Sequence, residues 1–252
     1  GGLAIDTGGL LHPGKWFAGL LDLAEQAGAQ LHEATHVSSI RRQADGRFVV
    51  ETDRGAVNAR DVLVATNGYT DGAAPSLRRR IIPIGSYIIA TEPLDPAVAR
   101  QVSPRGRMFF DSKNFLYYWR VLEDGRMMFG GRASMAPTTV ARTRDILYRA
   151  MVEIHPQLRG TRVVRAWGGN VGFTFDRIPH AGRTGGIAYA LGYCGTGVAL
   201  SWHLGRRMGA WMAGDDPPPF VGLRFPIPPA GAASSRFLPA AGLYYRLRDR
   251  IG

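Results

Sequence analysis

The chain has 252 residues, of which 45% are hydrophobic and 20% are charged, and its formal net charge is +11. A chain of this length and composition folds as one large or two small globular domains. A single cysteine excludes an internal disulfide framework and fits a reducing compartment, so we expect a cytoplasmic protein. The basic residues are scattered apart from Arg78, Arg79 and Arg80, and the sequence has neither zinc-finger spacing nor an RNA-binding aromatic signature. We therefore do not expect a nucleic-acid-binding protein.

The N-terminal part is predicted to form a helix and then a three-stranded meander. Apolar residues recur at helical spacing from residue 16 to residue 27, and Gly28 follows them, which predicts a helix that ends at this glycine. Two turn signals, Asp45-Gly46 and Arg54-Gly55, then separate three extended runs. The runs are residues 30–40, 47–52 and 56–60.

The first of these runs contains a zinc-protease motif, HExxH, between His32 and His36. The motif binds zinc only on a helix, where residues four apart share one face. On an extended segment the two imidazoles would stand about 13 Å apart, at roughly 3.3 Å per residue. We therefore expect no metal site, and a zinc hydrolase is only a remote alternative.

Longer strands are predicted in the middle of the chain. Residues 62–66 form a continuous apolar run, typical of a strand buried on both faces. Asp124-Gly125 is expected to turn the last pair of a further set of strands, and a helical pattern then ends near Pro156. The set comprises residues 81–91, 108–111, 116–121 and 127–130, and the helical pattern covers residues 138–155.

The most informative segment is residues 185–214, which we interpret as a buried strand, a glycine-rich turn and a helix. Gly192, Gly195 and Gly197 bracket the turn, and glycines allow backbone N–H groups to approach a ligand closely. The helix N-terminus that follows favours electron-rich or anionic partners. A tight connection without a ligand is the alternative on the turn alone. Residues 185–204 carry no Asp, Glu, Lys or Arg, but their glycine content and change of period favour this interpretation over a membrane span.

Five stretches in order resemble the D-amino-acid oxidase-like flavoenzymes, and most of all their gamma-glutamylputrescine oxidoreductase-type branch. The resemblance spans nearly the whole chain. The stretches are GGLLHPGKWFAGLLDLAEQAGA from Gly8, VLVATNGYT from Val62, RRIIPIGSYIIATEPL from Arg79, FTFDRIPHAG from Phe173 and GYCGTGVALS from Gly192.

The resemblance implies an α/β (α+β) fold, in which a partial FAD/NAD(P)-binding Rossmann-like domain carries an inserted antiparallel β-rich substrate domain. The implied divisions are 1–79 and 163–216 for the FAD-binding domain, 80–162 for the substrate domain, and 217–252 for a proline-rich tail. The family opens with a G-x-G-x-x-G turn that holds the FAD pyrophosphate, and this sequence has no such pattern. We therefore expect a C-terminal portion whose partner is the missing N-terminal Rossmann segment.

The resemblance also implies a set of residues that contact FAD. The cofactor is expected to be non-covalent, because Val171 stands where sarcosine oxidase-type relatives have a cysteine bonded to the flavin. Ala199 and Met128 stand where relatives have lysines, which leaves oxidase versus dehydrogenase open. Cys194 is favoured as a small residue under the flavin over a reactive thiol. The implied contacts are Val37, Ala65, Thr66, Asn67, Gly68, Gly192, Tyr193, Cys194, Gly195, Thr196 and Gly197.

For the substrate, the resemblance implies a small-molecule amine or amino acid whose C–N bond is oxidised to an imine, with hydride transfer to the flavin. Aromatic residues can wall an amine pocket, and arginine can bind a carboxylate through two hydrogen bonds. We select Tyr87, Arg120 and Arg132 as catalytic candidates, although the alternating YYWR run around Arg120 also suits simple packing in a sheet. The alternative class is a catalytically incomplete fragment or basic binding module. The amine and the oligomeric state are left open.

Overall fold

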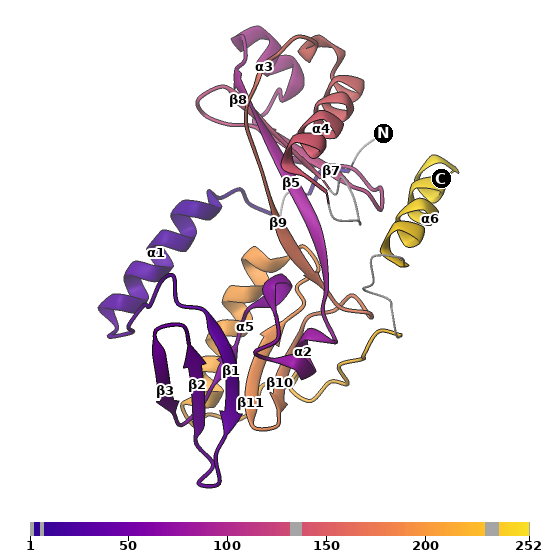
Figure 1. Ribbon diagram of the computed structural model, residues 1–252. Helices are drawn as coiled ribbons and strands as arrows, with labels where there is room; N and C mark the ends of the chain where they lie inside the picture. The colour runs from indigo at the N-terminus through magenta and orange to yellow at the C-terminus, as the bar shows by residue number, and fades with distance from the viewer. Residues whose placement is uncertain (1–2, 6–7, 132–137, 230–236, 252) are drawn as a thin grey trace.

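The computed structural model describes residues 3–5, 8–131, 138–229 and 237–251. Figure 1 shows an upper unit built on one antiparallel sheet and a lower unit with two smaller sheets, joined by two long strands. The mixed helix-and-sheet fold with antiparallel strands confirms the expected fold class. No helix within the described ranges combines the length and apolarity needed to cross a bilayer.

The lower unit begins with the predicted helix and meander. Helix α1 (Pro13–Gln26) ends beside Gly28, whose φ of +90° suits a glycine. Strands β1 (Val37–Arg42), β2 (Phe48–Thr52) and β3 (Gly55–Ala59) form an antiparallel sheet in sequence order. The expected extension from residue 30 is wrong, because residues 30–36 are irregular and Ala34 has a φ of +48°.

The second lower sheet has the order β10-β11-β4, with β10 (His180–Thr184), β11 (Ile187–Leu191) and β4 (Leu63–Val64). Strand β4 pairs parallel to β11. The run 62–66 is therefore only a two-residue strand. It is not buried on both faces, because Leu63 is 36% exposed while Val64 is buried.

Different elements cover the two faces of this sheet. Helix α5 (Gly197–Met212) packs on one face, where Leu204 and Met208 meet the alanines of β10 and β11. The other face packs against α2 (Pro75–Arg78) and the later chain, through Leu77 and Phe225. The sheet therefore separates two environments within the lower unit.

The upper sheet has the order β6-β7-β8-β5-β9. Helix α4 (Val140–Ile154) covers one face, where Leu147 and Met151 pack on Ile89 and Phe129, and α3 (Pro96–Val102) adds Val102 to this core. The strands are β5 (Ile82–Pro93), β6 (Phe109–Phe110), β7 (Tyr117–Val121), β8 (Arg126–Gly131) and β9 (Val163–Phe173).

Strand β9 extends the upper sheet further along the chain than we expected. It pairs with β5 from Ile82↔Phe173 to Thr91↔Val163. The strand therefore leads from the upper unit to the lower unit, and the boundary expected at residue 163 falls at its first residue.

The C-terminal part is not a proline-rich tail throughout. Residues 215–229 are largely irregular, as expected, but α6 (Phe237–Ile251) follows. Asp249 of α6 accepts hydrogen bonds from the backbone N–H groups of Asn114 and Phe115, at 2.8 and 2.9 Å. Pro239 lies in the first turn of this helix, where proline is tolerated.

Candidate functional site

Three segments that are distant in sequence meet around the glycine-rich turn. They are the short 3₁₀ turn η1 (Asn67–Tyr69) after β4, the lower end of β9, and residues 192–196 between β11 and α5. Asn67 Oδ1 accepts a hydrogen bond from Gly192 N–H at 3.0 Å, and Cys194 N–H donates to Gly172 O at 3.0 Å. The turn is therefore fixed from both sides.

Three glycines in this region serve the packing of protein against protein. A Cβ on Gly172 would lie 2.4 Å from Asn67 Oδ1, and a Cβ on Gly68 would lie 2.7 Å from Asn170 O. A Cβ on Gly192 would lie 2.2 Å from Thr174 Cγ2. These positions let the backbones of η1, β9 and the turn touch.

Gly195 faces open space instead, and Gly197 has room for a Cβ without a clash. Gly195 has a φ of +106° and nothing within 4 Å of an added Cβ, and the nearest atom to one on Gly197 is Tyr193 Cβ at 3.6 Å. Gly195 and Thr196 are exposed. A ligand can approach the backbone here without meeting other protein atoms.

The N-terminus of α5 opens at the same place. Its N-cap, Thr196, makes no capping hydrogen bond through its side chain, and its Oγ1 instead donates to Tyr193 O at 2.7 Å. The first-turn amides of a helix have no acceptor within the helix, and the helix dipole gives them partial positive charge. This geometry fits the electron-rich edge of a flavin.

Tyr193 and Cys194 fix the turn through hydrogen bonds to neighbouring backbone carbonyls. Tyr193 is buried, its hydroxyl donates to Ala190 O at 3.2 Å, and burial raises its pKa above the ordinary value of 10.0. Cys194 has a φ of +53°, and its thiol donates to Gly192 O at 3.2 Å and lies 3.5 Å from Thr174 N. These contacts favour a packing role for the cysteine. Buried Thr174 had no sequence signal beyond its place in the FTFDRIPHAG stretch.

The other residues expected to contact the cofactor lie in different parts of the lower unit. Ala65 and Thr66 follow β4 and are exposed, and Thr66 Oγ1 lies 2.8 Å from Thr70 Oγ1. Val37 begins β1 in the separate three-stranded sheet and is half-buried. The side chain of Asn67 secures Gly192, and its expected contact with FAD stays a prediction.

The substrate candidates do not converge. Residues directly opposite in antiparallel strands share a face, and the register places Tyr87 with Phe129 on the face under α4, where it packs on the core. Arg120 lies opposite Met128 on the other face and donates to Leu11 O at 3.2 Å. Arg132 lies outside the described residues.

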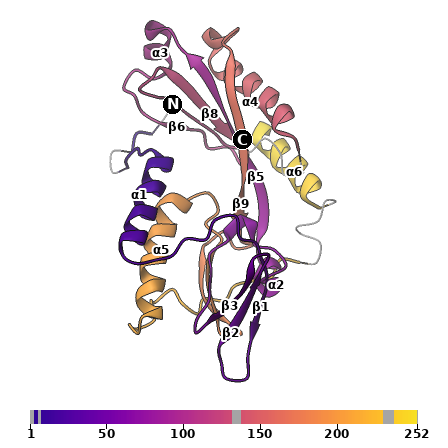
Figure 2. The same ribbon diagram turned by 60° about the vertical axis from the view of Figure 1, so that its left-hand side comes forward.

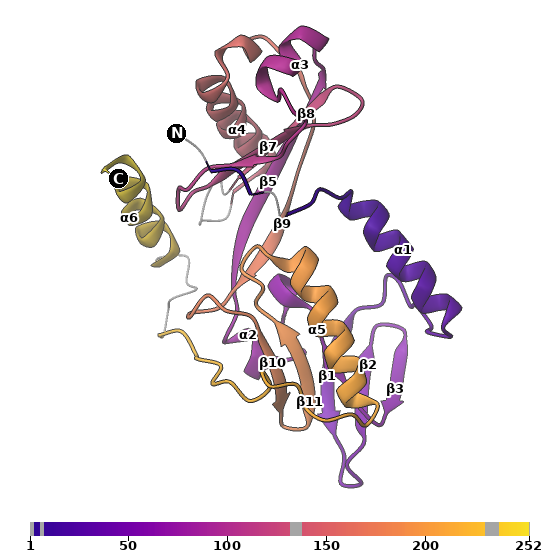
Figure 3. The ribbon, with the colours of Figure 1, turned by 180° about the vertical axis from the view of Figure 1, so that it is seen from behind.

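The face that carries Arg120 looks toward α1 and α5 (Figures 2 and 3). Tyr118 shares this face. Its hydroxyl lies 3.3 Å from Ser86 Oγ, and its ring lies where a Cβ on Gly130 would stand, 2.4 Å from Tyr118 Cε2. Trp167, opposite Ile88, is 42% exposed here.

The HExxH residues form no metal centre. His32, Glu33 and His36 lie in the irregular segment before β1, and the described parts of the chain contain no group of three or more His, Cys, Asp or Glu able to hold a metal ion. His36 instead lies 3.9 Å from Asp71. The HExxH residues therefore lack the helical spacing that a zinc-protease motif uses.

Comparisons with known proteins agree with this arrangement. A family model described as FAD dependent oxidoreductase matches residues 1–211. The chain is 34% identical to "Probable oxidoreductase OrdL" of Haemophilus influenzae, over 99% of this chain and 59% of that protein. It is 31% identical to gamma-glutamylputrescine oxidoreductase of Escherichia coli, over 100% of this chain and 60% of that protein.

Solved structures share the fold. Glycine oxidase from Geobacillus kaustophilus gives a TM-score of 0.69 at 19% identity, over 84% of this chain and 56% of that chain. L-proline dehydrogenase from P. horikoshii gives 0.66 at 19% identity, over 82% and 57%. The chain spans less than two thirds of the length of the curated relatives it matches.

Proposed function

Because the chain belongs to the FAD-dependent oxidoreductase family, we propose that it forms the flavin-facing and substrate-facing part of an enzyme that oxidises the C–N bond of an amine or amino-acid-like substrate to an imine. The family assignment confirms the resemblance inferred from the sequence motifs. The observation that carries the proposal is the open N-terminus of α5 beside Gly195 and Gly197, fixed against the strand that leads to the Arg120 face.

FAD is the cofactor of this family, and when bound it supplies the acceptor for the hydride that leaves the amine carbon. The residues of this chain prepare its place. Gly195 and Gly197 leave room for close approach, and the first-turn amides of α5 stabilise negative charge on the ring edge. Val171 offers no nucleophile, so the association is proposed to be non-covalent.

On the substrate side, we propose that Arg120 orients the substrate. A guanidinium can hold a carboxylate through two parallel hydrogen bonds, and its present acceptor, Leu11 O, is a single carbonyl that a carboxylate can replace. Tyr118 and Trp167 provide aromatic surface on the same face. Tyr87 acts only by packing behind them, and Arg132 stays a proposed substrate contact on the sequence argument alone.

A partner segment that carries a G-x-G-x-x-G turn is part of the proposal. None of the 14 residues of α1 is buried, and Phe17 and Leu23 are 62% and 61% exposed. Apolar surface of this kind marks an interaction site. We propose that the partner covers α1 and supplies the pyrophosphate site.

The test is to purify the 252-residue chain alone and together with a relative's N-terminal Rossmann segment, and to record the flavin absorbance and quantify FAD. We expect a colourless chain alone and a yellow complex that a panel of amines and amino acids bleaches without oxygen. A chain that is yellow and monomeric alone would contradict the need for a partner. A flavin-loaded complex that no amine or amino acid bleaches would contradict the reaction.

Two variants of that complex test which face of the upper sheet binds the substrate. Arg120→Lys should raise KM for carboxylate-bearing substrates about tenfold or more, because one hydrogen bond of a charged pair is lost. Tyr87→Phe, on the opposite face, is the matched control and should leave KM unchanged. Equal effects of the two changes would contradict the assignment of the substrate to the Arg120 face.

A further inference from the structure

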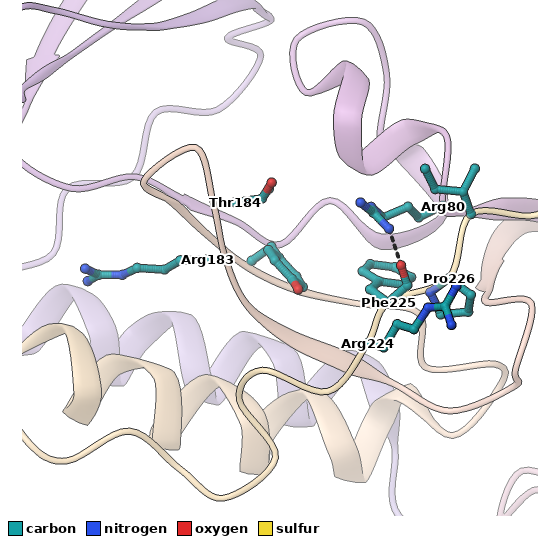
Figure 4. Close-up of a pocket in the computed structure, with 8 residues that line it drawn as sticks. Arg80, Arg183, Thr184, Arg224, Phe225 and Pro226 are labelled. Carbon is teal, nitrogen blue, oxygen red and sulfur yellow. Dashed lines mark hydrogen bonds between the residues drawn. The ribbon is translucent and has the colours of Figure 1, made fainter.

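A hollow lies in the lower unit, away from the glycine-rich turn. It has a volume of about 470 Å³ and lies where the tail crosses the face of the β10-β11-β4 sheet opposite α5 (Figure 4). It is not part of the flavin or substrate arrangement proposed above. Its wall includes Arg80, Arg183, Thr184, Tyr189, Arg224 and Phe225.

The wall of this hollow carries three arginines and no carboxylate. Arg183 is already compensated, because its guanidinium lies 3.5 Å from Asp61 and 4.7 Å from the centre of the Trp211 ring. In Figure 4 it extends away from the other two. Within the described residues, neither Arg80 nor Arg224 has an acidic partner within ion-pair distance, so the hollow holds uncompensated positive charge.

Arg80 is fixed in place before any ligand arrives. One of its guanidinium nitrogens donates to Phe225 O, and its guanidinium carbon lies 5.5 Å from the centre of the Phe225 ring. The Phe225 ring in turn stacks on buried His180, with ring centres 4.2 Å apart and planes at 7°. An arginine held in this way loses little rotamer freedom when it binds an anion.

Hydroxyl donors complete the wall. Thr184 ends β10 and Tyr189 lies within β11, and both line the hollow. Tyr189 is buried, and burial raises the pKa of its phenol while the charge of Arg80 opposes that change. The phenol is therefore a neutral donor over the physiological pH range.

We propose that this hollow binds a phosphate group, held by Arg80 and Arg224 with help from the hydroxyls of Thr184 and Tyr189. Two guanidinium groups match the charge of a phosphate dianion. A phosphate also offers more acceptor oxygens than the two of a carboxylate, so it can accept hydrogen bonds from both arginines and the hydroxyls. The chemistry fits inorganic phosphate as well as a phosphate ester.

The experiment measures binding of inorganic phosphate to the 252-residue chain by calorimetry, in chloride buffer of matched ionic strength. A small phosphate monoester and a dicarboxylate are titrated in parallel. We expect phosphate or the monoester to bind, Arg224→Gln to weaken binding about tenfold or more, and the exposed Arg79→Gln to leave it unchanged. Preference for the monoester would identify an ester as the ligand.

Arg224→Glu provides a second readout that does not depend on loss of binding. The new carboxylate lowers the positive charge of the wall, so thermal stability in chloride should rise or hold while the response to phosphate disappears. Equal binding by the wild-type and Arg224→Gln chains would overturn the proposal. So would an absence of binding by the wild-type chain, or dicarboxylate binding as tight as that of both phosphates.

Discussion

At the scale of the residue, the glycines near the turn are there for two different physical reasons. Gly68, Gly172 and Gly192 are required because other protein atoms occupy the space of a Cβ. Gly197 has no such neighbour and has no positive φ, so the fold itself tolerates a side chain there. A cost of substitution at Gly197 would therefore report on what lies outside the chain.

Gly197→Val should weaken FAD binding by the reconstituted complex roughly tenfold to a hundredfold, since a bulky group would cost about 1–3 kcal/mol against a close ligand. Flavin titration measures the change. Gly205→Val is the matched control, because Gly205 lies in the same helix, has no positive φ and has nothing within 4 Å of an added Cβ. Equal affinity of the two variants would show that the turn does not meet the flavin.

His155 ends α4 and is the residue whose titration opposes folding. Its ring meets Trp119 edge-on at 5.3 Å, and its buried Nε2 has no hydrogen-bond partner among the described residues. Burial lowers the pKa of His155 below its ordinary value of 6.5. The unfolded chain then binds a proton more readily than the folded chain, so stability falls as pH decreases through the unfolded value.

We expect the free energy of unfolding to fall between about pH 7 and about pH 5.5, and to fall less in His155→Gln. Urea denaturation of both chains at the two pH values gives the difference. His36→Gln serves as the control, because His36 is exposed. A pH dependence that is the same in the wild-type and His155→Gln chains would contradict this account.

At the scale of the element, sequence signals predicted a helix or hairpin correctly where its structure depends on residues close together in the chain. The helical spacing up to Gly28 and the hairpin signal at Asp45-Gly46 depend only on neighbouring residues, and both predictions are confirmed. Strand β9 was missed because its glycines suggest a turn, and only pairing with β5 makes them a strand. The opposite faces of Tyr87 and Arg120 follow from register, which a run of apolar and aromatic residues does not specify.

Asp249 joins helix α6 to the amides of Asn114 and Phe115, a contact that no local pattern in the sequence indicated. Burial would raise the pKa of Asp249, but the hydrogen bonds from Phe115 and Asn114 and the charge of Lys113 outweigh it, and the pKa is lowered. A carboxyl with a lowered pKa stabilises the fold above its unfolded value of 3.8, and the contribution is lost as pH falls through the folded value.

Asp249→Asn should therefore release α6, because an amide offers one acceptor oxygen in place of two. The measurement is hydrogen exchange, which should accelerate in α6 and at the amides of Asn114 and Phe115 while the core of β8 is unchanged. Asp145→Asn on the exposed surface of α4 is the control. Unchanged exchange in α6 would mean that other contacts hold the helix.

At the scale of the whole molecule, the two units share strands rather than a linker. The pairs from Ile82↔Phe173 to Thr91↔Val163 run through both of them, and η1 and the turn bind to the lower end of β9. A unit cannot unfold while its share of this ladder stays paired. The expected consequence is a single cooperative transition.

Hydrogen exchange under increasing denaturant tests this expectation, by comparing slow amides in β7 and β8 with those in β10 and β11. Both sets should converge on one free energy of opening. If the lower sheet opens at a distinctly lower free energy, the units are separate and the shared strands do not couple them.

On the proposed function, the same shared strands set the distance between the substrate and the flavin. The distance between the Arg120 face and the glycine-rich turn depends on the number of residues in β5 and β9, at about 3.3 Å for each residue. Lengthening both strands by two residues would lift that face about 7 Å with every side chain on its original side, whereas one residue would invert the faces. On the proposed function, the length of these two strands sets the distance that a substrate spans between Arg120 and the flavin, and this distance changes in discrete steps.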